Sequence, residues 1–227
     1  MAIFEIIADY YDDNIVNGRF DHDAVVKRLS SFIEESPFFV ADLASGTGNM
    51  ANAVHKHWPL SRVLCEEPSV SMAKLLKKKF PIFLVRRRTL QETRIKSQDL
   101  VTIAFNSINY LKPTLLPSVF RRIRLGMNNG GIFYFDALTE ESAFDMLNGK
   151  AFMEKTRKRG PLTIYSRLTL KKIFHRFSLS NGDLEEHTQY LISEKKYLKL
   201  LSSAHFDVLN VRSLPGTLRS EFICKSV

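Results

Sequence analysis

A short turn of small and polar residues carries the strongest chemical signal in this chain of 227 residues. The turn reads Asp42-Leu43-Ala44-Ser45-Gly46-Thr47-Gly48-Asn49 and follows an apolar segment at 38–43. Gly46 and Gly48 have no Cβ, so a ligand can approach the main chain closely. A helix expected at 49–57 would present free backbone N–H groups at its first turn. The pattern therefore predicts a binding site for an anionic or polar ligand.

A carboxylate follows at the end of the next expected strand, in Glu66-Glu67-Pro68-Ser69. At this distance from a glycine turn, Glu67 is placed to accept hydrogen bonds from both hydroxyls of a ribose. The glycines do not fit the dinucleotide pattern G-x-G-x-x-G, because Ala44 stands first and the third glycine is missing. The turn also lacks the lysine and hydroxyl pair of a phosphate-binding loop. Asp42 is interpreted as a structural acid that organises the turn.

Six histidines offer candidates for proton transfer. His175 and His187 lie on expected late strands, where either one could accept a proton from a substrate. The other four are expected at the surface: His22, His55, His57 and His205. The histidines and cysteines do not have the spacing of a metal site, so no metal is expected.

These residues need a parallel sheet to bring them together. Between residues 20 and 136, short apolar runs alternate with amphipathic stretches, which is typical of βαβ units. The predicted strands are 38–43, 62–66, 81–85, 100–105 and 131–136, and the predicted helices are 23–33, 49–57, 70–79 and 115–125. A tight turn is expected at 128–131. Because ligands bind at the carboxyl ends of parallel strands, the glycine turn and Glu67 should meet at one edge.

The second half of the chain has a different pattern. Residues 139–160 are expected to be helical or loop-like, and 163–170, 171–179 and 186–192 to be antiparallel strands with a turn at Asn181-Gly182. A helix at 194–204 and strands at 208–211 and 221–224 complete the expected elements. The predicted organisation is one domain, 1–227. Its parts are a helical cap at 1–35, a ligand-binding core at 36–138, a lid at 139–192 and closing elements at 193–227.

The composition is that of an ordinary globular protein, with 44% hydrophobic and 25% charged residues. Two cysteines exclude a disulfide framework, and the N-terminus lacks the basic and apolar segments of a signal peptide. Together these features predict a cytoplasmic protein that does not enter the membrane. The net charge of +9 comes from separate basic clusters at 77–79, 86–88, 121–124 and 155–159. These clusters keep nucleic acid open as an alternative partner, although no aromatic residues are interleaved with them.

Four segments in the order of a known family give a more specific interpretation. Ala41 to Gly48 resembles motif I of class I S-adenosylmethionine-dependent methyltransferases, and Glu67-Pro68-Ser69-Val70-Ser71-Met72 resembles their second motif. The segment Phe105 to Leu111 resembles the stretch after their fourth strand, and Asn129 to Phe133 the approach to their fifth. The late strands are similar in pattern to sugar N-methyltransferases and glycine N-methyltransferase-like enzymes. The resemblance implies an α/β fold, with a Rossmann-like, mostly parallel seven-stranded sheet, flanking helices and an antiparallel insertion over the active site.

The resemblance also implies roles for individual residues. Ala44, Gly46 and Gly48 would line the methionine and ribose portion of S-adenosylmethionine, and Glu67 would hold the ribose. The adenine would lie on Pro68 and Met72 and against the backbone N–H of Leu90. Phe105, Asn106 and Tyr110 would flank the methionyl end. Tyr11 and Arg19, near the N-terminus, would close over it.

Two positions depart from the family pattern. Ala44 replaces the usual first glycine, which is acceptable only if its φ is negative. Thr89 stands where many members carry an aspartate that contacts adenine.

The sequence thus predicts a methyltransferase that acts on N or O of a small molecule in the biosynthesis of a specialised metabolite. His187, His175 and Tyr11 are the candidate catalytic residues. Two alternatives remain open: an RNA or protein methyltransferase that uses the basic clusters, and a non-catalytic protein that has kept the fold. A homodimer is compatible with the sequence.

Overall fold

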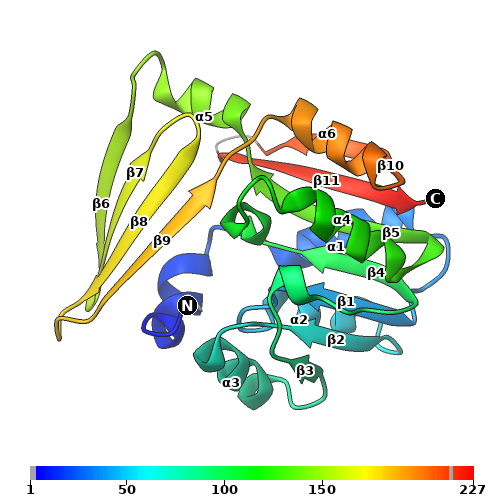
Figure 1. Cartoon of the computed structure of the whole chain (residues 1–227). Helices are drawn as coiled ribbons and strands as arrows, with labels where there is room; N and C mark the ends of the chain where they lie inside the picture. Colours follow the sequence, from blue (N-terminus) through cyan, green and yellow to red (C-terminus); the bar gives the residue numbers. More distant parts are fainter. Residues whose placement is uncertain (1–3, 215–216) are drawn as a thin grey trace.

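The computed structural model describes residues 4–214 and 217–227, and these residues form two sheets with helices around the larger one (Figure 1). The larger sheet has seven strands in the order β10-β11-β5-β4-β1-β2-β3. Its strands are β1 (Phe39–Leu43), β2 (Arg62–Glu66), β3 (Leu84–Arg86), β4 (Gln98–Ile103), β5 (Met127–Leu138), β10 (Phe206–Ser213) and β11 (Arg219–Ser226). Strands β1 to β5 are parallel, whereas β11 pairs antiparallel with β5 and β10 pairs antiparallel with β11, so that only β11 runs in the opposite direction. The expected seven-stranded, mostly parallel architecture is confirmed.

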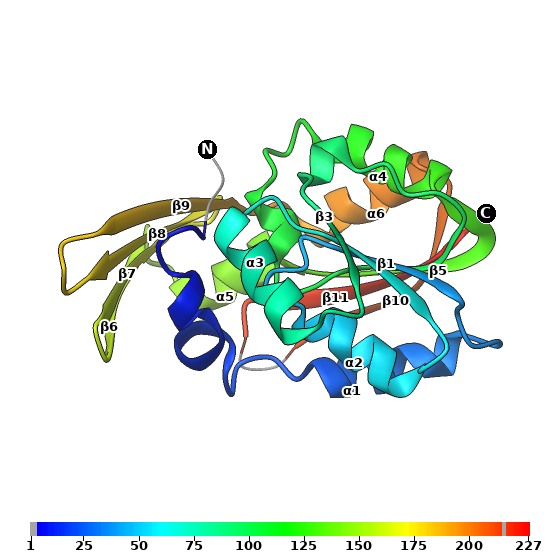
Figure 2. The same ribbon diagram turned by 90° about the horizontal axis from the view of Figure 1, so that it is seen from below.

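Helices cover both faces of the seven-stranded sheet, as the turned view in Figure 2 shows. Apolar residues of α1 (His22–Leu29), α2 (Asn49–His57) and α3 (Val70–Lys79) pack in one buried cluster. Those of α4 (Leu116–Leu125) and α6 (Glu194–Ser203) pack in the other. Each helix buries one apolar stripe and leaves its charged residues in solvent, which is the reason for the helical periodicity of the sequence.

The position of the reversal in strand order fixes where a ligand can bind. Strand β1 lies between β2 and β4, so the chain leaves β1 towards one side of the sheet and later returns to the other. In an open parallel sheet, the crevice at this switch point lies beyond the carboxyl ends of the strands. The glycine turn after β1 and the segment that begins at Phe105 after β4 both lie there.

A second, four-stranded antiparallel sheet extends to one side of the main sheet (Figure 1). We call it the lid sheet. It contains β6 (Met153–Arg159), β7 (Leu162–Leu168), β8 (Lys172–Leu179) and β9 (Leu184–Tyr190), after the short helix α5 (Glu140–Leu147). Directly paired residues of antiparallel strands point to the same face. The pairs Lys155–Ser166, Ser166–His175 and His175–His187 therefore form one polar row across all four strands.

Several expected boundaries were wrong. Residues 153–159 form β6 rather than helix or loop, because this edge strand carries charged side chains on both faces and gives no apolar alternation. The segment 128–131 lies within β5, where the pairing with β4 is irregular, rather than in a separate turn. Helix α1 ends at Leu29 and continues only as one 3-10 turn, η3 (Ser30–Phe32).

Candidate functional site

Glu67 joins the two loops that follow β1 and β2. Its Oε2 accepts a hydrogen bond from the backbone N–H of Gly46 at 2.8 Å, and its Oε1 accepts one from Ser69 N–H at 2.8 Å. The residue is only 5% exposed, and this burial raises the pKa of the carboxyl to about 7 against the opposing effect of the two N–H donors. The side chain therefore changes charge close to neutral pH.

Asp42 fixes the start of the glycine turn from within the sheet. Its carboxylate accepts a hydrogen bond from the Thr102 hydroxyl on β4 at 2.7 Å, and burial raises its pKa to about 7. The Ser45 hydroxyl donates to the Asp42 carbonyl at 2.6 Å. These contacts hold the turn against β1 and β4, which is the structural role expected for this acid.

The backbone of the turn differs from the expectation at Ala44. The expected negative φ was wrong, because the φ of Ala44 is +54°. This alanine therefore occupies the left-handed region, which glycine adopts without a penalty. Gly48 also has a positive φ, of +89°. A Cβ on Gly48 would lie 3.0 Å from side-chain atoms of Leu76 and Phe80, so this glycine allows α2 and α3 to approach closely.

A cavity of about 750 Å³ lies over the two loops. Its wall includes Gly46 and Glu67 from these loops. Thr89 and Leu90 also line it. Of the predicted cofactor-binding residues, the structure brings eight together here: Tyr11, Ala44, Gly46, Glu67, Pro68, Met72, Leu90 and Tyr110. Gly48 is not among the lining residues, because it faces α3.

A small pocket of about 30 Å³ also adjoins the glycine turn and shares Tyr11 with the larger cavity. It is lined by Ala44 and Gly46 from the turn, by Phe105 after β4, and by His22. Burial lowers the pKa of His22 to about 4, so this histidine is neutral at physiological pH. The pocket therefore lies at the carboxyl end of β1, with both polar and apolar walls.

The N-terminal segment spans from the lid sheet to α3 and closes over the larger cavity. We call residues 4–11 the N-terminal strap. Glu185 on β9 accepts hydrogen bonds from the backbone N–H groups of Phe4 and Ile6, and Glu5 accepts bonds from Val70 and Ser71 N–H at 2.8 and 3.0 Å. Glu5 thus satisfies free donors at the start of α3, where a negative charge is favourable.

Aromatic contacts hold the strap against the cavity walls. The Phe4 ring packs edge-on against Tyr11, Tyr110 and His187, with centroid distances of 4.4–5.5 Å. Burial raises the pKa of Tyr11, so its phenol keeps its proton and is a donor, not a base, at neutral pH. Phe4 was not predicted as a site residue, because the contact of the N-terminal segment with the lid sheet has no local signal in the sequence.

A second cavity, of about 550 Å³, lies between the core and the inner face of the lid sheet. Its lid wall is Met153, Lys155, Arg157, Ile164, Ser166, Leu168, Ile173, His175, Phe177 and Gln189. The predicted residues Arg19, Phe105 and Asn106 line this cavity from the core side, and it shares Phe4, Tyr11, Ser107 and Tyr110 with the larger cavity. No acidic side chain of the described residues lines it, whereas Arg19, Lys155, Arg157 and Arg219 do.

Two residues missed by sequence reasoning shape the boundary between the cavities. Asp136 at the end of β5 accepts a hydrogen bond from Asn106 N–H at 2.8 Å, which holds Phe105 and Asn106 at φ values of +56° and +52°. Arg219 on β11 lies 3.7 Å from Asp136, donates to Asn106 Oδ1 at 3.1 Å and stacks over the Phe105 ring. Arg219 is far away in sequence from these residues, and only the antiparallel pairing of β11 with β5 brings it here.

The two candidate histidines lie side by side on the lid sheet in different surroundings. His175 lines the second cavity, with Ser166 Oγ 2.8 Å from its Nδ1 and Gln189 Oε1 3.3 Å from its Nε2. Burial lowers the pKa of His175 to about 4, assisted by the charges of His187 and Arg157. His187 is buried, lines the larger cavity, and has its Nε2 2.8 Å from Glu185 Oε1.

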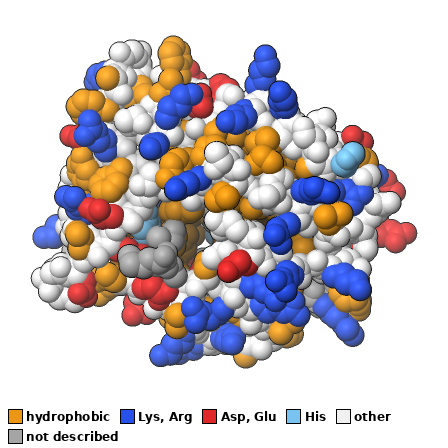
Figure 3. All heavy atoms as spheres, in the orientation of Figure 1, with side chains coloured by type: hydrophobic (Ala, Val, Ile, Leu, Met, Phe, Trp, Pro, Cys, Tyr) orange, Lys and Arg blue, Asp and Glu red, His pale blue; other side chains and the backbone are white. Residues whose placement is uncertain are grey.

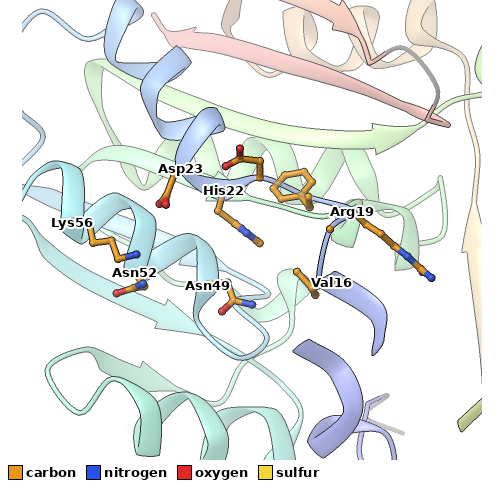
Figure 4. A pocket seen from close by; sticks show the side chains of 10 residues that line it. Val16, Arg19, His22, Asp23, Asn49, Asn52 and Lys56 are labelled. Carbon is orange, nitrogen blue, oxygen red and sulfur yellow. The ribbon is translucent and has the colours of Figure 1, made fainter. Parts of the chain in front are cut away.

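An open polar groove of about 730 Å³ lies apart from the two cavities, between the start of α1 and helix α2 (Figure 4). Asn49, Asn52 and Lys56 line it from α2, and His22 and Asp23 line it from α1. Arg19 also borders this groove but points away from Asn52 and Lys56 in this view. The structure therefore places Arg19 between the groove and the second cavity, outside the small pocket beside the glycine turn.

The basic side chains form several separate groups on the face seen in Figure 3 rather than one continuous patch. No described helix has both the length and the apolar character needed to cross a membrane. Within residues 4–214 and 217–227, no three His, Cys, Asp or Glu side chains are grouped as a metal site would require.

Comparisons with known proteins match at the level of structure only. No protein-family model and no curated protein sequence matches the chain. Among solved structures, an S-adenosylmethionine-dependent methyltransferase from Clostridium acetobutylicum superposes with a TM-score of 0.80 at 18% identity, covering 97% of each chain. The sugar N-methyltransferase KedS8 from Streptoalloteichus gives 0.76 at 16% identity, covering 100% of this chain and 94% of that one. CalS10, an amino pentose methyltransferase from Micromonospora echinaspora, gives 0.73 at 14% identity over 100% and 99%. The chain therefore has the fold of class I S-adenosylmethionine-dependent methyltransferases.

Proposed function

We propose that this chain is an S-adenosylmethionine-dependent methyltransferase that methylates a nitrogen or oxygen of a small molecule. The observation that carries the proposal is the pair of cavities, which share Phe4, Tyr11, Ser107 and Tyr110 as common walls. One cavity lies over the glycine turn and Glu67, and the other lies under the lid sheet. Two molecules bound in them would meet at these shared residues.

The larger cavity fits S-adenosylmethionine by the chemistry of its wall. Glu67 offers carboxylate oxygens for ribose hydroxyls, and Gly46 leaves its backbone accessible beside it. Pro68, Met72 and Leu90 supply an apolar surface for the adenine. The small pocket lined by Tyr11 and Phe105 adjoins the glycine turn on the side where the methionyl end would begin. When bound, S-adenosylmethionine supplies an activated methyl group.

The chain's own residues would align the acceptor and exclude water. The strap and the lid sheet cover the shared walls, and orientation of this kind can contribute a large part of the rate. The second cavity has four cationic residues and no acidic one among the described residues. This charge disfavours an ammonium group, so an amine acceptor would be held as the neutral base that can attack a methyl group.

A cavity of about 550 Å³ suits a small molecule rather than a polymer. On the face seen in Figure 3, the separate groups of basic side chains also give less support to an RNA acceptor than a continuous patch would. CalS10 is described as involved in calicheamicin biosynthesis, and KedS8 as a sugar N-methyltransferase. By analogy we place this chain in the biosynthesis of a specialised metabolite.

Calorimetric titration with S-adenosylmethionine and S-adenosylhomocysteine tests the proposal. We expect saturable binding of both, and binding about 10–100-fold weaker in Glu67→Ala, because hydrogen bonds to a charged group are lost. Glu35→Ala is a suitable control, because this glutamate is exposed and lies outside the cavities. If neither compound binds, or if Glu67→Ala binds as tightly as the wild type, the proposal fails.

A further inference from the structure

A chain of hydrogen bonds crosses from the core into the lid sheet and ends in the second cavity. Gln189 Nε2 donates to the backbone carbonyl of Asn106 at 3.4 Å, and Gln189 Oε1 faces His175 Nε2 at 3.3 Å. His175 Nδ1 in turn lies 2.8 Å from Ser166 Oγ. These hydrogen bonds start next to Asp136, which accepts a hydrogen bond from the backbone N–H of Asn106. They end at the Ser166 hydroxyl, which lines the cavity.

The Asn106 carbonyl, at which these hydrogen bonds begin, fixes the order of donors and acceptors along the series. A backbone carbonyl can only accept, so the Gln189 amide must turn its nitrogen towards Asn106. Its oxygen then faces His175, and this oxygen can only accept, so His175 Nε2 must carry the proton. Nδ1 of the neutral ring is left as an acceptor, and the partner that can donate to it is the Ser166 hydroxyl.

The surroundings of His175 keep the ring neutral. Directly paired with it on the neighbouring strands are Ser166 and His187, neither of which is an acid. Arg157 lines the same cavity, and no described acidic residue does. Burial, assisted by the nearby Arg157 guanidinium, lowers the pKa of His175 to about 4 against the opposing effect of the Gln189 hydrogen bond. The ring therefore fixes the Ser166 hydroxyl and is poorly suited to act as a general base.

We propose that Ser166 binds the methyl acceptor and selects molecules that present an N–H or O–H group to it. Because its only proton is directed to His175, the Ser166 oxygen can only accept further hydrogen bonds. An amine or a hydroxyl donates to it, whereas a carbonyl oxygen at the same place would face a lone pair. His175 and Gln189 are positioning residues that act through Ser166. The inference rests on the proposed function for what fills the cavity, but the proton arrangement does not depend on it.

The tautomer of His175 can be measured directly. Long-range ¹H–¹⁵N spectra of the labelled protein distinguish the two neutral tautomers from the charged ring, and His175→Gln assigns the signals. We expect an Nε2–H ring that stays neutral from pH 5 to 8, and a mixture of tautomers in Gln189→Leu. The wild-type spectrum is decisive even if that variant fails to fold. A wild-type ring with its proton on Nδ1, or a charged ring in this range, overturns the proposal.

Two probes of equal size test the selection itself. We expect cyclohexanol to shift the His175 signals, and to bind about three- to tenfold more tightly than cyclohexanone, as loss of one hydrogen bond implies. Ser166→Ala should remove this preference, whereas Ser178→Ala on the opposite face of the lid sheet should retain it. No binding of the alcohol, equal binding of the two probes, or an unchanged preference in Ser166→Ala contradicts the inference. Failure of the S-adenosylmethionine titration alone would defeat the proposed function and leave these results unaffected.

Discussion

The Glu67 carboxylate and the Gly46 backbone N–H are joined by a hydrogen bond of 2.8 Å, so the acid after β2 holds the glycine turn after β1 in place. The same carboxylate faces the larger cavity. One side chain therefore both shapes the turn and offers oxygens to a ligand, and its protonation affects both functions.

The affinity for S-adenosylmethionine should fall as the solution becomes acidic. The pKa of Glu67 is about 7 in the protein, and ribose hydroxyls favour the ionised carboxylate. Protonation therefore competes with binding below pH 7, and we expect the dissociation constant to rise roughly tenfold per pH unit between pH 6.5 and 5. Calorimetry over pH 5–7 measures this, with Glu67→Gln as the control. A slope of the same size in Glu67→Gln would assign the effect to another group.

Ala44→Gly should stabilise the protein. Ala44 has a φ of +54°, which costs an L-residue about 1–2 kcal/mol, whereas glycine adds up to about 1 kcal/mol of unfolded-state entropy. The expected net gain in the free energy of unfolding is about 0.5–1 kcal/mol, measured by urea denaturation. Ala53→Gly within α2 is the matched control and should destabilise by about 1 kcal/mol. Equal losses in both variants would refute the strain at Ala44.

Comparing Gly48→Ala with Gly18→Ala should distinguish the cost of close packing from the cost of backbone strain in the free energy of unfolding. Both glycines have positive φ, but a Cβ meets Leu76 and Phe80 at 3.0 Å only at Gly48, and nothing lies within 4 Å at Gly18. We expect Gly18→Ala to lose about 1–2 kcal/mol from strain alone. Gly48→Ala should lose an additional 1–3 kcal/mol, about the usual cost of overpacking. Thermal unfolding of the two variants would show no difference if α3 does not in fact pack on the turn.

The N-terminal strap should control how fast S-adenosylmethionine leaves. Glu5 attaches the strap to the first turn of α3 through Val70 and Ser71 N–H, so Glu5→Ala should loosen it. We expect faster dissociation in stopped-flow displacement and faster hydrogen exchange over residues 4–11, with little change in overall stability. The exposed Asp9 provides the control, as Asp9→Ala. An unchanged dissociation rate in Glu5→Ala would show that the strap does not gate the cavity.

The core of the fold was predictable because each of its signals is local. The apolar run of β1, the helical spacing of α2 and the acid at Glu67 each lie within a few neighbouring residues, and the structure places them as expected. The irregular start of β5 was not predictable, because it depends on the register with β4.

The lid and the site boundary were harder to predict. Strand β6 escaped detection because Lys155, Arg157 and Arg159 replace the apolar residues of an ordinary half-buried strand. Arg219 and Phe4 reach the site through long-range pairing and through the path of the terminus. No local pattern in the sequence encodes either of these contacts.

The inner face of the lid sheet has a consequence for how such a protein can diversify. Alternate positions of four short strands form the lid wall of the second cavity, and none of these positions lines the larger cavity. Substitutions at Ser166, Leu168 or Ile173 are therefore expected to change the accepted molecule while the donor site stays intact.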